Sequence, residues 1–250
     1  MRNEFFVGWR DVGPRLRGFL RLAALGTLLA APLLALVLGA TARDPEGASW
    51  ALVPGSAALT PLPMGEAVLT GVLTLRPSPV LHLPVSPEAP RGRPVLLADD
   101  GKRGAALPAE LDGRGVTASG FILSRGSLDM LVLGAMPVAA PRPVDGPAVE
   151  PLGRWRISGE ICDGKCATGG MRPGSGVGHR ACAVLCLEGA LPAVFVANAP
   201  VAGSAFLLLG GSDGGLLPAA LHARVGQPVT LEGRLERRGG LLVLLVESHP

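Results

Sequence analysis

The stretch Val116-Thr-Ala-Ser-Gly-Phe-Ile-Leu-Ser-Arg-Gly126 returns 113 residues later as Val229-Thr-Leu-Glu-Gly-Arg-Leu-Glu-Arg-Arg-Gly239. A short apolar run follows each copy, at 128–133 and at 241–246. Upstream, Leu107-Pro-Ala-Glu-Leu111 matches Leu217-Pro-Ala-Ala-Leu221. A repeat of this length predicts two copies of one structural unit, each closing with a pair of strands.

The parts before the repeated turn correspond more loosely. Gly71-Val-Leu-Thr-Leu and Gly159-Glu-Ile-Cys-Asp each open a unit as a first strand, while Val95-Leu-Leu-Ala and Phe206-Leu-Leu-Leu precede the turn. The order is strand, long excursion, strand, short helix or turn, then hairpin. It resembles the oligonucleotide/oligosaccharide-binding (OB) fold, a five-stranded Greek-key barrel with a helix between its third and fourth strands. The closing hairpin is similar to that of exported bacterial OB-like domains.

Composition agrees with a mainly β protein. The 250 residues include 36 Gly and 24 Pro but only 17% charged residues, which favours short strands and turns over long polar helices. A net charge of +3 is too small to favour a polyanionic partner. After Trp50 the aromatic residues are too few to stack a single strand, so no nucleic-acid partner is expected.

One apolar segment is long enough to cross a bilayer. Residues Leu22 to Ala42 carry no charge, and five arginines precede them. A helix there would span about 30 Å of hydrocarbon, with the basic flank in the cytoplasm. We therefore expect a bacterial inner-membrane protein with its bulk in the periplasm or outside the cell. The alternative is a cleaved signal peptide, because Ala40-Thr41-Ala42 has the small-x-small pattern of a cleavage site.

These observations divide the chain as follows: a basic cytoplasmic arm at 1–21, a transmembrane helix at 22–42, a tether at 43–64, an OB-like domain at 65–138, a Pro-rich linker at 139–153, and a second OB-like domain at 154–250 with a Cys/His insertion at 162–189. This arrangement resembles membrane-anchored bacterial proteins with tandem periplasmic OB-like domains.

The insertion contains all four cysteines, Cys162, Cys166, Cys182 and Cys186, in the pattern C-x3-C-x12-H-x2-C-x3-C. From His179 the sequence predicts a helix that stops at Gly189, with Cys182 and Cys186 on one face. Because the count is even and the expected compartment is oxidising, we expect two disulfides that staple the glycine-rich loop, and no cofactor.

Two alternatives use the same residues. The four thiols and His179, with Met171 as a further ligand, suit zinc, copper or an iron–sulfur centre, although neither cysteine pair has the C-x2-C spacing usual for zinc. A thiol-redox centre is the other alternative, since Cys182 and Cys186 lie near a helix start. Lys165, Arg172 and Arg180 are candidate contacts for an anion or a partner.

Catalytic patterns do not stand out. The sequence has no G-x-S-x-G motif, and its other histidines are scattered. The expected function is therefore a non-catalytic, membrane-anchored binding or accessory protein whose stapled loop recognises a protein partner in the membrane or periplasm, as a subunit of an envelope or redox complex. A metal-binding or thiol-redox protein, or a purely structural subunit, remains the alternative.

Overall fold

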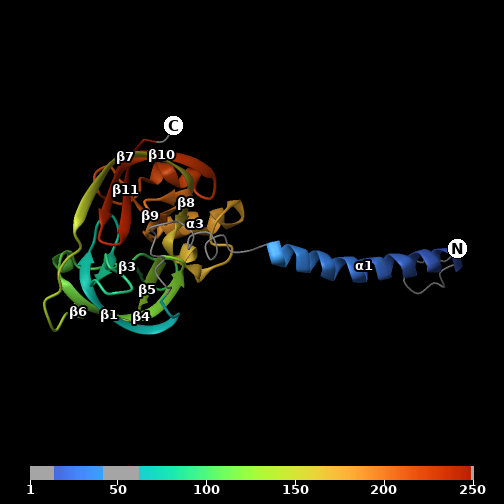
Figure 1. The fold of residues 1–250 in the computed structure, drawn as a ribbon, viewed down its shortest axis with the longest axis horizontal. Coiled ribbons are helices and arrows are strands. Elements are labelled where there is room, and N and C mark those ends of the chain that lie inside the picture. Colours follow the sequence, from blue (N-terminus) through green and yellow to red (C-terminus); the bar gives the residue numbers. More distant parts are fainter. Residues whose placement is uncertain (1–13, 42–61, 249–250) are drawn as a thin grey trace, which may run out of the picture. The chain divides into compact units, whose positions relative to one another are not determined.

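The structure is a computed structural model that describes residues 14–41 and 62–248. The predicted basic arm up to residue 13, the predicted tether from 43 to 61 and the two last residues lie outside the described residues. The chain divides into an N-terminal unit, which contains one helix, and a β-rich unit that contains everything from Glu46 onward. The mainly β class is confirmed (Figure 1).

The N-terminal helix α1 runs from Pro14 to Thr41 and includes Pro32. Its segment Leu16–Leu38 has a mean hydropathy of 2.0, and its described side chains are exposed. By length and composition this segment is long and apolar enough to cross a membrane.

The first sheet is built from five strands that pair in a ring and a short sixth strand. Its elements are β1 (Gly65–Thr74), β2 (Val80–Leu83), β3 (Arg93–Ala98), the 3-10 helix η2 (Ala109–Leu111), β4 (Gly115–Arg125), β5 (Leu128–Leu133) and β6 (Val138–Ala139). The strand order is β1-β2-β3-β5-β4-β6, and β1 also pairs with β4. The neighbours β3 and β5 are parallel.

The second sheet is a closed five-stranded barrel. Its elements are β7 (Val149–Asp163), the π-helix η3 (Cys166–Gly170), the 3-10 helix η4 (Val177–His179), α3 (Arg180–Glu188), β8 (Ala193–Val201), β9 (Ser204–Gly211), the 3-10 helix η5 (Ala219–Arg224), β10 (Pro228–Arg238) and β11 (Leu241–Ser248). The strands close in the order β10-β11-β9-β8-β7, with β9 and β11 parallel.

The sequence repeat is a structural repeat. In the first sheet Gly71 pairs with Val116, and in the second Gly159 pairs with Val229. A Cβ on Gly120 would overlap the carbonyl oxygen of Val132, and a Cβ on Gly233 would overlap that of Leu245. These two contacts are 113 positions apart, as in the sequence repeat. Only glycine allows adjacent strands to approach this closely in both copies.

The two sheets share a third apolar core between them. Separate cores fill each sheet, around Leu97 in the first and Phe195 in the second. The third core joins residues of both sheets, among them Leu96, Met130 and Phe206. In Figure 1 the first sheet (cyan to green) lies directly against the second (orange to red). The loop and helix with the cysteines lie at this junction, where Gly104 N donates to Gly189 O over 2.8 Å.

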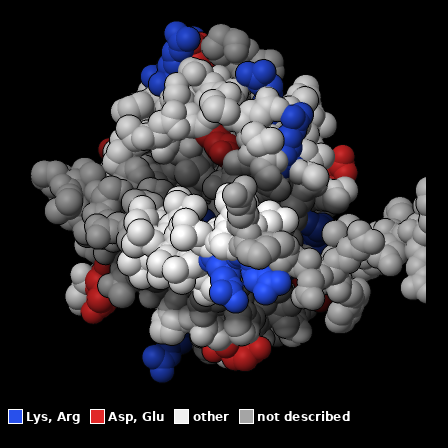
Figure 2. Space-filling view, turned by 90° about the vertical axis from the view of Figure 1, so that its right-hand side faces the viewer, with Lys and Arg blue, Asp and Glu red and all other residues white. Residues whose placement is uncertain are grey.

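Charged side chains are scattered on the face drawn in Figure 2. Groups of Lys or Arg and of Asp or Glu alternate there with uncharged surface, and no continuous patch of one sign covers it. Such a surface provides little long-range attraction for a polyanion.

Candidate metal centre

Strand β7 ends inside the molecule and places Asp163 at the centre of the cysteine-bearing segment. Asp163 is fully buried. One carboxylate oxygen, Oδ1, accepts a hydrogen bond from the backbone N–H of Cys166 over 2.9 Å, which fixes the turn from β7 into η3. Thr168 closes η3 by donating to the carbonyl oxygens of Gly164 and Lys165. A buried carboxylate that holds a turn in this way leaves its second oxygen for another partner.

That partner is His179, at the end of η4 and the start of α3. The imidazole is 2% exposed, and its Nε2 lies 2.9 Å from Asp163 Oδ2. Because an ionised carboxylate only accepts, Nε2–H donates, and in the neutral form of the ring Nδ1 carries the free lone pair. Nδ1 is buried and has no hydrogen-bond partner within the described part of the chain. A buried nitrogen without a partner is costly unless a ligand completes it.

Two of the four thiols lie close to this histidine, and a third lies beside them. The ligand atoms of Cys166, His179 and Cys182 lie within 4.8 Å of one another, and so do those of Asp163, Cys166 and Cys186. Cys186 also hydrogen-bonds with both Cys166 and Cys182. Helix α3 presents Cys182 and Cys186 on one face, as the sequence predicted, while Ala183 and Leu187 pack into the barrel core. The result is a compact set of three sulfur atoms and one imidazole.

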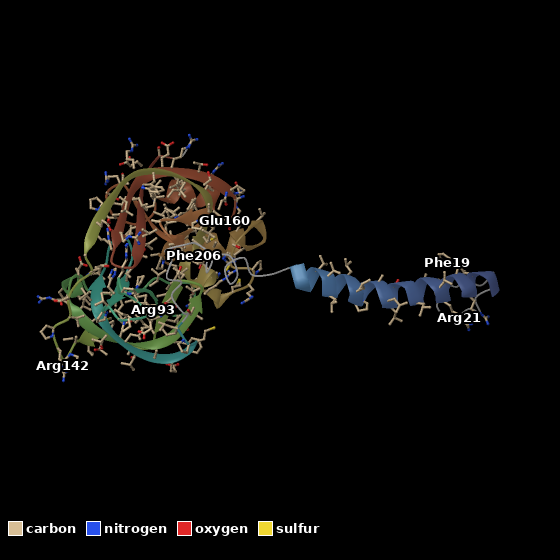
Figure 3. The ribbon with its side chains drawn as sticks, in the orientation of Figure 1. Phe19, Arg21, Arg93, Arg142, Glu160 and Phe206 are labelled. Atoms are coloured by element: carbon tan, nitrogen blue, oxygen red, sulfur yellow. The ribbon has the colours of Figure 1, made fainter. Side chains whose placement is uncertain are left out.

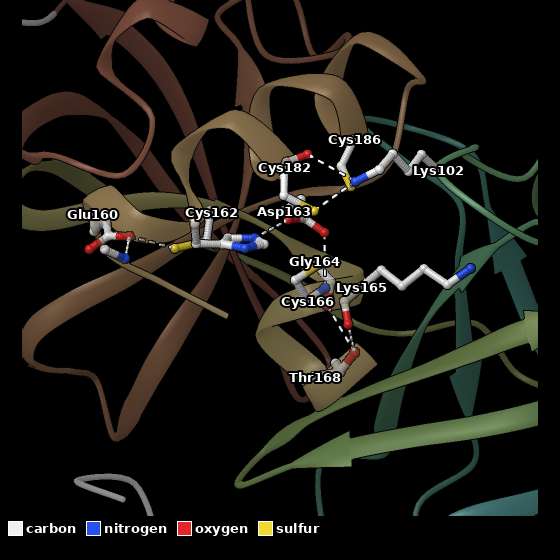
Figure 4. Close-up of polar contacts among 12 residues, drawn as sticks. Lys102, Glu160, Cys162, Asp163, Gly164, Lys165, Cys166, Thr168, Cys182 and Cys186 are labelled. Carbon is white, nitrogen blue, oxygen red and sulfur yellow. Dashed lines mark hydrogen bonds and ion pairs between the residues drawn. The ribbon is translucent and has the colours of Figure 1, made fainter. Parts of the chain in front are cut away.

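A lysine from the first sheet completes the cluster. Lys102 follows β3, and its Nζ lies 2.7 Å from Cys182 Sγ and 3.7 Å from Cys186 Sγ (Figure 4). Lys165 donates to the carbonyl oxygens of Asp99 and Gly101 over 2.9 Å and so holds the turn that carries Lys102. These are the only two lysines in a sequence with 21 arginines. The Lys102 ammonium contacts sulfur directly, whereas that of Lys165 binds the backbone of the turn.

The electrostatics divide the thiols into an acidic and a weakly acidic member. The hydrogen bond to Cys186, together with burial, raises the pKa of Cys166 far above its usual range. The same hydrogen bond lowers the pKa of Cys186, assisted by the Lys102 ammonium. The contact with Cys182 in turn raises the pKa of Lys102. Cys186 is therefore the member of this pair that loses its proton more readily.

The expected disulfides are absent, and this part of the prediction is corrected. All four cysteines lie in the described residues, and none of them forms a disulfide. Cys162 lies within β7, and its Sγ donates to Glu160 Oε1 over 3.2 Å. The other three thiols lie together beside His179 and Lys102, and three thiols cannot form two disulfides among themselves. The physical reason is that β7 directs Cys162 to a different neighbour, so two crosswise pairs do not assemble.

The remaining predicted residues have other surroundings. Arg180 donates to the carbonyl oxygen of Ala223 over 2.9 Å. Lys165 is engaged with the turn described above. Arg172 is exposed, and the side chain of Met171 is 44% exposed. The buried cluster thus consists of cysteine, histidine and aspartate side chains together with the tip of Lys102.

Sequence reasoning missed two contributors. Asp163 belongs to no motif that the sequence analysis singled out, although its place one residue after Cys162 puts it beside the cluster. Lys102 is 60 residues away from the first cysteine in sequence and belongs to the other sheet. The scarcity of lysine was the one signal that could have singled out both Lys102 and Lys165.

The arrangement can bind a soft or borderline metal ion. Three sulfur ligands and one imidazole match the Cys3His ligand set of tetrahedral zinc. The hydrogen bond from histidine to a carboxylate matches the way metal-binding histidines are oriented. Nucleophilic catalysis by a cysteine–histidine pair fits less well, because His179 Nδ1 has no thiol within hydrogen-bond reach among the described residues.

Comparison with known proteins yields no relative. No family model matches the chain, and neither the curated proteins nor the solved structures contain a match. The functional conclusion therefore depends on the site itself.

Proposed function

We propose that this chain is a membrane-anchored metal-binding protein in which Cys166, His179, Cys182 and Cys186 hold one zinc ion. The observation that carries the proposal is His179: its Nδ1 is a buried nitrogen with no partner among the described residues, and one of its ring nitrogens lies within 4.8 Å of the sulfur atoms of Cys166 and Cys182. A metal ion would give that nitrogen a partner and would bind the three sulfur atoms at the same time.

Charge balance favours a divalent ion. Three thiolates, a neutral imidazole and the Asp163 carboxylate carry four negative charges, of which a divalent ion and the Lys102 ammonium cancel three. A monovalent ion such as Cu(I) would leave two negative charges uncompensated in a buried site, which is more costly. Zinc and Cu(I) are both soft enough to bind thiolates, so the charge of the ion, and not its softness, favours zinc.

The site is closed in the sense used for structural zinc. The protein would supply all four ligands, so no coordination position is left for water or substrate. This supports a non-catalytic role, in which the metal stabilises the loop between β7 and β8 or is passed to a partner. Cys182, the least buried of the four cysteines, is the ligand nearest to solvent.

The setting of the site is proposed on separate grounds. The cyclic order of paired strands, with a parallel third and fifth strand, is the same in both sheets, and we infer that both are OB-like. The apolar helix α1 and the basic residues before its apolar core support a single span with the N-terminus in the cytoplasm and both barrels in the periplasm. An anchored barrel pair without a visible catalytic set fits an accessory protein with a protein partner.

Cobalt substitution of the full chain in detergent tests the ligand set. Apoprotein titrated with Co(II) is expected to take up one equivalent, with sulfur-to-cobalt charge-transfer absorption and the intense visible bands of a tetrahedral site. Zinc should then displace the cobalt. Because Cys166 and the other ligands must lose protons, the affinity should fall as the pH is lowered.

The chain offers a matched control for the variants. Cys166→Ser, Cys182→Ser, Cys186→Ser and His179→Gln should each weaken binding at least about tenfold, whereas Cys162→Ser should leave the stoichiometry and spectrum unchanged. An equal loss in Cys162→Ser, or no cobalt absorption in the unsubstituted protein, would show that the proposed ligand set is wrong.

A further inference from the structure

A cavity of about 280 Å³ lies at the junction of the two sheets, apart from the cysteine cluster. Its lining combines residues of the β2–β3 segment, the start of β5, the β8–β9 turn and the β10–β11 hairpin. Apolar side chains form much of this lining: Leu96, Leu128, Phe206, Leu241 and Leu242. Phe206 belongs to the core shared by the two sheets and lies in the middle of the β-rich unit (Figure 3).

The charged residues of this lining are all cationic. They are Arg91, from the first sheet, and Arg237, from the second, and no acidic residue lines this cavity. The hydroxyl-bearing residues Ser127 and Ser204 complete its polar part. The cavity thus has an apolar body and a polar end that carries two guanidinium groups.

Arg237 is held in an unusual state for an arginine. Its side chain is 14% exposed, and its Nε is buried without a hydrogen-bond partner in the described ranges. The nearest carboxylate oxygen, of Glu150, lies 3.8 Å from Nε, and one terminal nitrogen donates to Ala202 O over 3.2 Å. Burial and the nearby charge of Arg91 lower the pKa of Arg237. A partly desolvated guanidinium with so little compensation is poised for an anion.

The neighbouring arginine is also available. Arg91 is exposed and makes no ion pair with any residue that the structure describes. Arg93, by contrast, is neutralised by Asp129, with 2.6 Å between Nε and Oδ2. Arg237 is paired less closely than Arg93, since its contact with Glu150 is 3.8 Å long, and Arg91 has no ion pair among the described residues.

We propose that this cavity binds a small carboxylate with an apolar body, its carboxylate between Arg91 and Arg237 and its body against Leu96, Leu128 and Phe206. Guanidinium groups recognise carboxylates through paired hydrogen bonds, and apolar pockets supply the remaining affinity. The volume is at the lower end for small-molecule sites and suits a ligand with a single ring or a short chain.

A second cavity allows a larger ligand to continue outward. It has a volume of about 550 Å³ and shares Arg91, Gly92 and Arg237 with the first. Its acidic residues are exposed: Asp145 lies in the segment that joins the sheets, and Glu150 lies at the start of β7. They would repel a second negative charge, so the site favours a monoanion over a dianion.

Fluorine NMR on the full chain in a phospholipid nanodisc tests the proposal. The probe is para-(trifluoromethyl)benzoate, and its cationic counterpart is para-(trifluoromethyl)benzylamine, with empty nanodiscs as the blank. The benzoate is expected to bind saturably and the amine not to bind. Arg237→Met and Arg91→Met should each weaken benzoate binding, by about tenfold or more for Arg237.

Two controls make the result decisive. Arg142→Met changes an exposed arginine that lines neither cavity, and it should leave the affinity unchanged. Arg91 is exposed, so its variant reports on binding even if Arg237→Met folds poorly. Equal binding of the amine and the benzoate, equal effects of the Arg91 and Arg142 variants, or no saturable binding would overturn the proposal. Metal content is independent of these outcomes.

Discussion

The hydrogen bond between His179 and Asp163 decides which imidazole nitrogen is free. Asp163 also holds the backbone of Cys166, so one buried carboxylate orients two of the proposed ligands. A carboxylate in this position fixes the orientation of the imidazole ring. The quality of the metal site therefore depends on a residue that would not itself bind the metal.

Asp163→Asn tests this role. The amide keeps the size of the side chain but loses the charge, so we expect zinc affinity to fall by about 10- to 100-fold with the stoichiometry unchanged. Competition with a fluorescent zinc chelator measures it. Asp213→Asn changes an exposed carboxylate and should have no effect. Unaltered affinity in Asp163→Asn would contradict the assignment of His179 Nδ1 as a ligand.

His82 gives the β-rich unit a pH dependence of its own. It is 5% exposed, and its Nε2 lies 3.0 Å from the hydroxyl of Thr74. Burial, and secondarily the charge of Arg238, lowers its pKa from 6.5 to about 4. The folded protein therefore holds a neutral ring where the unfolded chain would take up a proton.

The stability of the protein should fall as the pH drops from about 6.5 to about 4, because only the unfolded state binds the proton there. The lowered pKa corresponds to about 3 kcal/mol across that window, fully present above pH 6.5 and lost below pH 4. Urea unfolding of the metal-free protein, followed by circular dichroism, measures it. His82→Gln should flatten the dependence of the free energy of unfolding on pH in this window. An identical slope in both proteins would show that His82 does not cause it.

Strands β4 and β10 occupy equivalent positions in the two sheets, and both use a glycine where the sheet closes. Each carries a glycine where the next strand approaches most closely, Gly120 against Val132 and Gly233 against Leu245. The β10–β11 pairing also changes register at Gly233. A closed barrel needs such points of tight curvature.

Gly233→Ala should destabilise the protein by about 1–3 kcal/mol, because the new Cβ overlaps a backbone oxygen that cannot rotate away. Gly146→Ala is the matched control, since its Cβ would make an ordinary contact of 3.9 Å with Val72 Cγ1. Denaturant midpoints of the three proteins measure the effect. Equal midpoints for Gly233→Ala and the unsubstituted chain would contradict the tight approach.

Much of this element structure was predictable from sequence. The repeated hairpins were found from Val116 and Val229, and the end of α3 at Gly189 was found from the glycine itself. The 3-10 helices η2 and η5 follow Pro108 and Pro218 at the repeated turn. These features depend on local residues, so the sequence carries their signal.

At the scale of the whole molecule, the site depends on a contact that no local pattern encodes. The two sheets join through a shared apolar core and through backbone contacts, such as Gly104 N with Gly189 O. Only this packing brings Lys102 to Cys182 and Cys186, and Arg91 close to Arg237. The number and spacing of the cysteines predicted disulfides, because the sequence alone does not show which neighbour the side chain of Cys162 meets within β7.

Intact mass of the full chain under native and denaturing conditions, with and without thiol alkylation, tests the central claim most directly. We predict one zinc-sized increment that is lost on denaturation, after which all four thiols take up the alkylating reagent. A mass four hydrogens below that of the reduced chain, with no metal and no alkylation, would show two disulfides and contradict the metal centre.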